Sequence, residues 1–146
     1  MSTQQTAKSA LKILVNSGKG YIVLDPQEKR TLLVAFARQN MVIYGKAFDI
    51  IKCSKKINFR NEEEVLANLK HITVCEVKST NRKNLPKDSG GYFFDLTTAE
   101  LLVAQSLKDR YKIIFVNTIT KRSTEMTLNE VFAKAKGIYP KWAIRF

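Results

Sequence analysis

The chain is poor in the residue types that build most zinc, redox and disulfide sites. It has one histidine, His71, and two cysteines, Cys53 and Cys75, among 146 residues. The cysteines have no C-x-x-C spacing, so they predict neither a zinc site nor a redox pair, and they are too few for a disulfide framework. We expect both thiols to be reduced and buried. We expect His71 at a helix C-terminus, where a cation suits the helix dipole.

Long apolar runs and acidic residues are also scarce. No segment approaches the roughly 18 consecutive apolar residues that span a membrane, and the N-terminus has no basic leader followed by an apolar block. We therefore expect a cytoplasmic protein with no membrane partner. The 25 Lys and Arg against 13 Asp and Glu give a net charge of +12. Such an excess favours an anionic partner, and nucleic acid is the first candidate.

Helix starts are marked by four capping signatures, in which an N-cap residue is followed three positions later by Glu or Gln. These pairs are Ser2 with Gln5, Asp25 with Glu28, Thr97 with Glu100, and Thr127 with Glu130. A fifth, shorter helix is predicted after Asn61. For the second pair an alternative stays open, because "GYIVLD" and "RTLLVAF" could instead be two strands joined by a turn.

Between and after these helices lie runs rich in β-branched and aromatic residues, which predict strands. The runs are "YIVL" from Tyr21, "MVIYGKAFDIIKC" from Met41, "ITVCEVKS" from Ile72, "GYFFDL" from Gly91, "YKIIFVNT" from Tyr111, and the final "WAIRF". Strands alternating with helices predict an α/β fold with a mixed central sheet flanked by helices. The length and the lack of linkers or repeats predict a single domain spanning residues 1–146.

Two opposite charges interrupt the apolar run "HITVCEVKST". Side chains alternate across a strand, so Glu76 and Lys78 share one face while Cys75 and Val77 point to the other. On an exposed face the pair would contribute at most a few tenths of a kcal/mol. On a buried face the two charges would be costly without further partners or a metal ion.

A second acid, Asp49 in "GKAFDIIKC", lies in another predicted strand between apolar neighbours. Aspartate is disfavoured in strand interiors, so this position needs an explanation of its own. A metal ion shared between Asp49 and Glu76 provides one.

The segments "GKAFDII" and "ITVCEVKST" together resemble the two-strand core of the PD-(D/E)xK nuclease superfamily, the fold of many restriction endonucleases and Holliday junction resolvases. The continuation through "GYFFDLTTAELLVAQSLKDRYKIIFVN" resembles the nuclease-like domain at the C-terminus of plant NO VEIN proteins and in many bacterial defence proteins. The resemblance covers roughly residues 45–118. It implies a restriction endonuclease-like core and metal-dependent hydrolysis of phosphodiester bonds in DNA.

The same resemblance implies roles for individual residues. The carboxylates of Asp49 and Glu76 and the carbonyl of Val77 would hold Mg²⁺ or Mn²⁺, since these are hard oxygen ligands. Lys78 would orient or help deprotonate the attacking water and stabilise charge on the phosphate. The predicted catalytic residues are therefore Asp49, Glu76 and Lys78.

The sequence departs from this pattern at the first helix, where many superfamily members have a further acid. Gln4 and Gln5 are the nearest polar residues there. Glu28 and Asp95 are candidate replacements elsewhere in the chain. We interpret Glu100 as the capping partner of Thr97 rather than as a ligand.

The segment "TNRKNLPKDSGG", from Thr80 to Gly91, leaves directly from the Glu76 strand. Its Arg82, Lys83 and Lys87 are candidate contacts to a nucleic-acid backbone. A solvated connector is the alternative interpretation of this loop.

Other functions remain open from the sequence alone. One is a non-catalytic nucleic-acid-binding module or structural subunit that keeps the nuclease-like fold. Another is an RNA-binding protein that stacks bases on the aromatic residues of "GYFF" and "NFR". For the nuclease, cutting both strands with one site per chain favours a homodimer, and a larger defence or repair complex is a further expectation.

Overall fold

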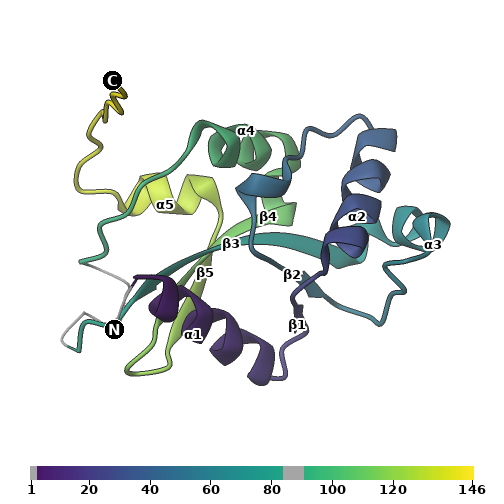
Figure 1. Ribbon diagram of the computed structural model, residues 1–146, viewed down its shortest axis with the longest axis horizontal. Helices are drawn as coiled ribbons and strands as arrows, with labels where there is room; N and C mark the ends of the chain where they lie inside the picture. Colours follow the sequence, from purple (N-terminus) through teal and green to yellow (C-terminus); the bar gives the residue numbers. More distant parts are fainter. Residues whose placement is uncertain (1–2, 84–90) are drawn as a thin grey trace.

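The computed structural model describes residues 3–83 and 91–146 and contains a five-stranded sheet in the order β1-β2-β3-β4-β5 (Figure 1). Strands β3 and β4 are parallel, and the other neighbouring strands are antiparallel. The strands are β1 (Tyr21–Ile22), β2 (Ile50–Cys53), β3 (Ile72–Thr80), β4 (Tyr111–Asn117) and β5 (Ser123–Met126).

Helices cover both faces of this sheet, which confirms the predicted α/β class with a mixed central sheet. Helix α1 packs on one face through Ala10 and Leu14, and the remaining helices lie on the other face. The helices are α1 (Thr3–Asn16), α2 (Pro26–Arg38), α3 (Glu62–Ala67), α4 (Thr98–Leu107) and α5 (Leu128–Lys134), with 3₁₀ turns η1 (Gly45–Ala47), η2 (Leu69–His71) and η3 (Lys108–Arg110). In the described part of the chain, no helix combines the length and apolar character needed to cross a membrane.

Alternation along β4 divides the buried side chains into two cores. Ile113 and Phe115 join the larger core, under α2 to α5, whereas Ile114 and Val116 join the smaller core under α1. In β3 the same alternation places Val74 in the larger core and Cys75 in the smaller one. A strand with both faces covered is apolar on both, which explains the continuous apolar run from Ile113 to Val116 in β4.

Capping explains where three of the helices begin. Reciprocal capping boxes join Asp25 to Glu28, Thr97 to Glu100 and Thr127 to Glu130, as predicted. The box at Asp25, with Pro26 in the first turn, makes residues 26–38 helical and excludes the alternative hairpin. Asn61 caps α3 through its side chain. Ser2 lies outside the described residues.

Both cysteines are free and buried, as predicted. Burial raises the pKa of the Cys53 thiol to about 11, so this thiol stays protonated and unreactive at neutral pH. His71 ends η2, and its Nδ1 atom lies 2.9 Å from the hydroxyl of Ser54.

The predicted strand at residues 41–53 is wrong over most of its length. Only Ile50–Cys53 pairs with neighbours, and Gly45–Ala47 is a 3₁₀ turn. Ala47 and Phe48 bury their side chains without joining the sheet, with exposures of 0% and 3%, whereas Val42 and Tyr44 are each 45% exposed. Apolar burial can therefore produce a strand-like pattern without a strand.

Two further predicted strands are wrong as well. In "GYFFDL", Tyr92 and Phe94 pack edge-to-face on Phe115, so alternate residues face the core although the segment joins no sheet. The final "WAIRF" is irregular and exposed, with Trp142 86% exposed. Conversely, β5 pairs with β4 although its sequence, "STEM", has no strand signal.

Candidate active site

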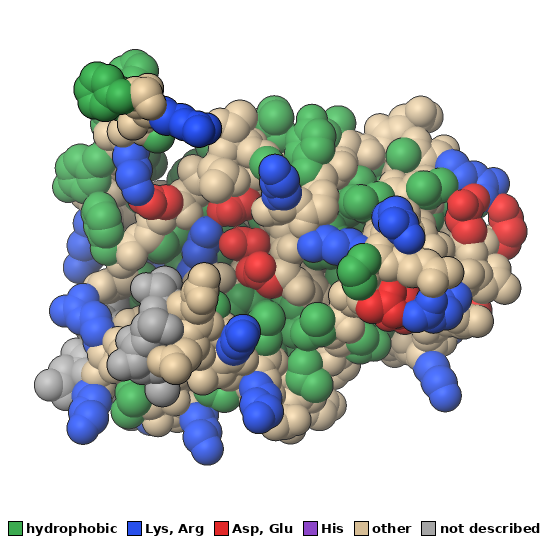
Figure 2. All heavy atoms as spheres, viewed as in Figure 1, with side chains coloured by type: hydrophobic (Ala, Val, Ile, Leu, Met, Phe, Trp, Pro, Cys, Tyr) green, Lys and Arg blue, Asp and Glu red, His purple; other side chains and the backbone are tan. Residues whose placement is uncertain are grey.

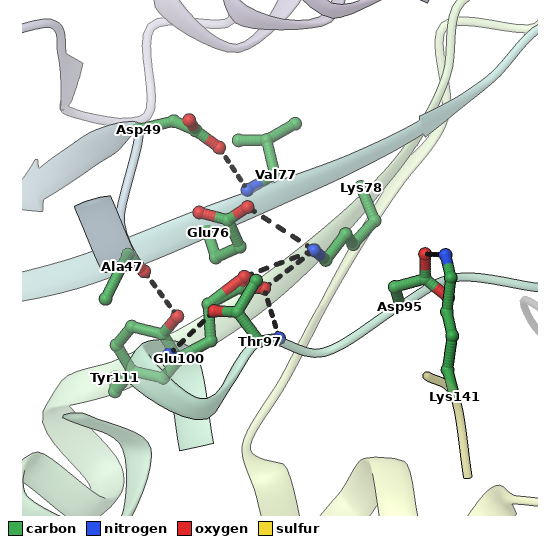
Figure 3. Close-up of polar contacts among 10 residues, drawn as sticks. All are labelled: Ala47, Asp49, Glu76, Val77, Lys78, Asp95, Thr97, Glu100, Tyr111 and Lys141. Carbon is green, nitrogen blue, oxygen red and sulfur yellow. Dashed lines mark hydrogen bonds and ion pairs between the residues drawn. The ribbon is translucent and has the colours of Figure 1, made fainter. Parts of the chain in front are cut away.

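The antiparallel pairing of β2 and β3 brings Asp49 beside Glu76. Ile50 pairs with Cys75, so Asp49, which precedes β2, lies next to the Glu76–Val77 peptide. The Asp49 amide donates to the Cys75 carbonyl at 3.0 Å, and the Val77 amide donates to Asp49 Oδ2 at 3.0 Å (Figure 3). The expected proximity of these two acids is therefore present in the fold, on the α4 side of the sheet.

The ammonium group of Lys78 lies between two carboxylates. Its Nζ atom is 2.8 Å from Glu100 Oε1 and 3.4 Å from Glu76 Oε1 (Figure 3). The side chains are largely buried, with exposures of 12% for Glu76, 17% for Lys78 and 3% for Glu100. The pair predicted on one face of β3 is thus a buried ionic cluster rather than a surface pair. Burial of this kind is costly unless the charges have partners.

Glu100 is the site residue that the sequence interpretation missed. It is indeed the capping partner of Thr97, but the same carboxylate also binds Lys78. The order of the elements along the chain could have indicated that Glu100 lies near Lys78. In a strand-helix-strand unit with parallel strands, the helix begins over the carboxyl end of the first strand. Helix α4 joins the parallel strands β3 and β4, so its first turn meets the part of β3 that carries Lys78.

Negative charge is in excess at this site. Burial, followed by the charges of Asp49 and Glu100, raises the pKa of the Glu76 carboxyl to about 9, although Lys78 opposes the shift. Burial alone would lower the pKa of Lys78. Its hydrogen bond to Glu100 and the charges of Glu76 and Glu100 outweigh that effect, so the pKa of Lys78 is raised. Three carboxyl groups thus share this site with one ammonium, and at neutral pH Glu76 keeps a proton that a bound cation would displace.

A buried tyrosine supports the turn that leads to Asp49. The Tyr111 hydroxyl donates to the Ala47 carbonyl at 2.6 Å, and Tyr111 is 1% exposed. Burial, followed by the neighbouring charges of Glu76 and Glu100, raises the pKa of Tyr111. The phenol therefore remains a neutral donor. It holds the backbone two residues before Asp49.

The donor set suits a hard cation. Asp49 and Glu76 supply carboxylate oxygens and Val77 supplies a carbonyl, the ligand types that Mg²⁺ uses while keeping several waters. A larger acidic ligand set does not form: among the described residues, no group of three or more His, Cys, Asp or Glu could hold a metal ion. Glu100 is instead engaged with Lys78.

The candidate replacements for the missing helix acid lie in other interactions. Glu28 completes the capping box of α2. Asp95 forms an ion pair with Lys141 at 2.5 Å, in an exposed position. Gln4 and Gln5 are exposed on α1, which packs on the opposite face of the sheet. The structure thus places Glu100, and neither candidate replacement, against Lys78.

The loop after β3 is described only in part. Arg82 and Lys83 are exposed beyond the end of β3. The Asn117 side chain donates to the Arg82 carbonyl at 2.9 Å, which fixes the start of this loop against β4. Lys87 lies outside the described residues. The assignment of these cations to nucleic-acid binding therefore stays a prediction.

Comparisons with family models, with curated proteins and with solved structures gave no match to this chain.

Proposed function

We propose that this protein is a metal-dependent nuclease that hydrolyses phosphodiester bonds in DNA. The observation that carries the proposal is that exposed Asp49 lies beside the largely buried Glu76 and Lys78 on one side of the sheet. Strongly perturbed ionisable groups gather at functional sites more than elsewhere, because buried charge is costly to maintain for structure alone. The sequence resemblance to PD-(D/E)xK nucleases agrees with these residues.

Asp49, Glu76 and the Val77 carbonyl would hold the divalent ion. When bound, Mg²⁺ would supply Lewis acidity toward the phosphate and a more acidic water. In the reaction a water oxygen bonds to phosphorus and its proton passes to solvent, while the bond from phosphorus to the leaving oxygen breaks and that oxygen takes up a proton. Lys78 would stabilise the negative charge that grows on the phosphate oxygens. Because its pKa is raised, we assign it the role of a cation and hydrogen-bond donor rather than a base.

Glu100 is a positioning residue in this scheme. It holds Lys78 Nζ at 2.8 Å from a helix whose own first turn is fixed by Thr97. We propose that it takes the place of the acid that α1 lacks, by orienting the lysine instead of the ion.

DNA as the substrate follows from charge. The net charge of +12 suits a polyanion, because neutralising phosphates is the sequence-independent part of nucleic-acid affinity. A two-fold dimer would place two such sites on one duplex. Membership of a defence or repair complex stays a prediction.

The test is nicking of supercoiled plasmid in the presence of Mg²⁺ or Mn²⁺. Wild type should convert supercoiled DNA to nicked or linear forms. Lys78→Ala and Asp49→Asn should each lower the rate about 100-fold or more, as expected when a group that stabilises the transition state is lost. Lys112→Ala is the matched control, because Lys112 lies on β4 facing the α1 side of the sheet. Equal cutting by Lys112→Ala and Lys78→Ala, or no cutting by wild type, would contradict the proposal.

A non-catalytic nucleic-acid-binding module is the second candidate. It is favoured by the lack of a group of three acids able to hold a metal ion among the described residues. Under this alternative, wild type and Lys78→Ala would bind plasmid equally and neither would cut.

A further inference from the structure

The last twelve residues, 135–146, form an exposed segment that we call the C-terminal arm. After α5 the chain leaves the body of the protein, and the green side chains at its end stand apart from the rest of the surface (Figures 1 and 2). Tyr139 is 73% exposed, Trp142 86% and Ile144 80%. Apolar side chains this exposed contribute nothing to the core, so they are available for a partner.

Cations alternate with the rings along the arm. Lys136, Lys141 and Arg145 lie among Tyr139, Trp142 and Phe146, and no acid follows Glu130. Aromatic rings that stack on bases, combined with cations that contact phosphates, are the elements by which proteins bind single-stranded nucleic acid. Charge complementarity therefore favours a nucleic acid over an uncharged apolar surface.

The arm contacts the segment that precedes the candidate active site. Lys141 forms an ion pair with Asp95 at 2.5 Å, and Asp95 lies two residues before Thr97, which caps α4 (Figure 3). The first turn of α4 carries Glu100, the partner of Lys78. This exposed ion pair therefore places the middle of the arm beside the segment that leads into the site.

The same segment exposes another ring. Tyr92 and Phe94 pack on Phe115, whereas Phe93, between them, is 84% exposed. Phe93 is two residues from Asp95, so a second unburied ring lies on the segment to which the arm is attached.

We propose that the C-terminal arm binds single-stranded nucleic acid by stacking its rings, Trp142 foremost, on unpaired bases beside the active site. This inference rests on the proposed nuclease function, because only a nuclease would cut DNA next to the bases that the arm binds. It defines the substrate class as DNA with unpaired bases next to the bond that is cut, rather than uniform duplex.

Trp142 is the only tryptophan, so its fluorescence reports on the arm alone. We would titrate the full chain with oligothymidylate in EDTA, where metal-dependent cutting is blocked. Saturable quenching is expected, and a duplex of equal length should quench less. By fluorescence anisotropy, Trp142→Leu should weaken binding of labelled oligothymidylate about fivefold or more. Phe132→Leu is the control, because Phe132 is a partly exposed ring on α5, outside the arm.

Three results would overturn the proposal. The first is unchanged fluorescence, or equal affinity of Trp142→Leu and wild type for oligothymidylate. The second is a dimer that dissociates in Trp142→Leu by light scattering, which would assign the arm to a second copy of the chain. The third is a fluorescence response to phosphatidylcholine and phosphatidylserine vesicles but not to oligothymidylate. Competition with oligouridylate then separates DNA from RNA as the preferred strand.

Failure of this inference is distinguishable from failure of the nuclease proposal. If oligothymidylate quenches Trp142 but wild type cuts no DNA with Mg²⁺ or Mn²⁺, the binding role of the arm is supported and the nuclease activity is not. If wild type nicks plasmid but Trp142 does not respond, the nuclease is supported and the arm is not.

Discussion

Glu100 completes a capping box and an ion pair with the same carboxylate. At the residue scale this double use explains why it was not predicted: the capping role accounted for it fully from local sequence. The shared face of Glu76 and Lys78 was predictable, because strand alternation alone places them on one side of β3. The position of Glu100 depends on how α4 crosses from β3 to β4, which no local pattern contains.

The substitution Glu100→Gln separates the capping role of Glu100 from its ion pair with Lys78. Glutamine can still serve in a capping box, whereas the charge facing Lys78 is lost. We expect the free energy of unfolding to fall by about 1–3 kcal/mol, because the buried ammonium loses its nearest carboxylate and the pKa of Glu76, about 9, leaves that carboxyl largely protonated at neutral pH. Urea denaturation measures this loss. Unchanged stability together with unchanged plasmid nicking would show that the ion pair matters for neither folding nor function.

Glu125 provides a pH-dependent contribution on the opposite face of the sheet. It accepts hydrogen bonds from Lys52, at 2.7 Å, and from the Tyr21 hydroxyl. Burial acts to raise the pKa of Glu125, but these hydrogen bonds outweigh it, so the pKa lies below its ordinary value of 4.5. The folded carboxylate thus holds its proton less tightly than the unfolded one. Its contribution to stability is present above about 4.5 and is lost as the pH falls through the folded pKa.

The prediction is that Glu125→Gln is less stable than wild type at neutral pH and that the difference shrinks as the solution becomes acidic. Urea denaturation at stepped pH values would show it. A difference that stays constant down to acid pH would mean that the carboxylate charge does not stabilise the fold.

Among the elements, the helices with local start signals and the apolar strands β3 and β4 were predicted from the sequence, whereas the polar strand β5 was not. Capping boxes involve residues three apart, so Asp25, Thr97 and Thr127 could be identified without tertiary structure. The polar edge strand β5 exists because β4 offers it a free edge. In "GYFFDL" the alternating burial is real, but the contacts are ring packing on Phe115 rather than backbone pairing.

Two capping boxes offer a matched pair of substitutions for testing α4. Thr97→Ala and Thr127→Ala each remove one N-cap side chain, and each should lower the free energy of unfolding by about 1 kcal/mol. Only the Thr97 cap precedes the helix turn that positions Glu100 against Lys78. We therefore expect Thr97→Ala to slow plasmid nicking more than Thr127→Ala, measured at a temperature where both variants are folded. Equal nicking rates for the two variants would show that the cap of α4 does not affect the position of Glu100.

Acidic and basic side chains are unevenly distributed over the displayed face of the molecule. Figure 2 shows acidic side chains near the middle of the displayed face, with lysines and arginines around them. Composition predicted the net charge and hence an anionic partner, but the arrangement of charges in space required the fold. The single-domain expectation for residues 1–146 stays a prediction.

If the loop after β3 contacts DNA, the affinity of the protein for DNA should fall as a power of the salt concentration, since the phosphates that are bound release counterions. Lys83→Ala should reduce the slope of log affinity against log salt by about one, as expected for one lost phosphate contact. Lys70→Ala, an exposed lysine on η2, is the control. An unchanged slope for Lys83→Ala would show that Lys83, in the loop after β3, does not contact a DNA phosphate.

The central claim is that Asp49 and Glu76 together form a binding site for one divalent cation. Titration with Mn²⁺, followed by electron paramagnetic resonance of the unbound ion, tests it without any substrate. Wild type should bind about one ion per chain, as expected for a site with two carboxylate ligands and a carbonyl. Asp49→Asn and Glu76→Gln should each lose most of that binding, while Glu125→Gln should retain it. Equal binding of Mn²⁺ by all four proteins, or none by wild type, would contradict the claim.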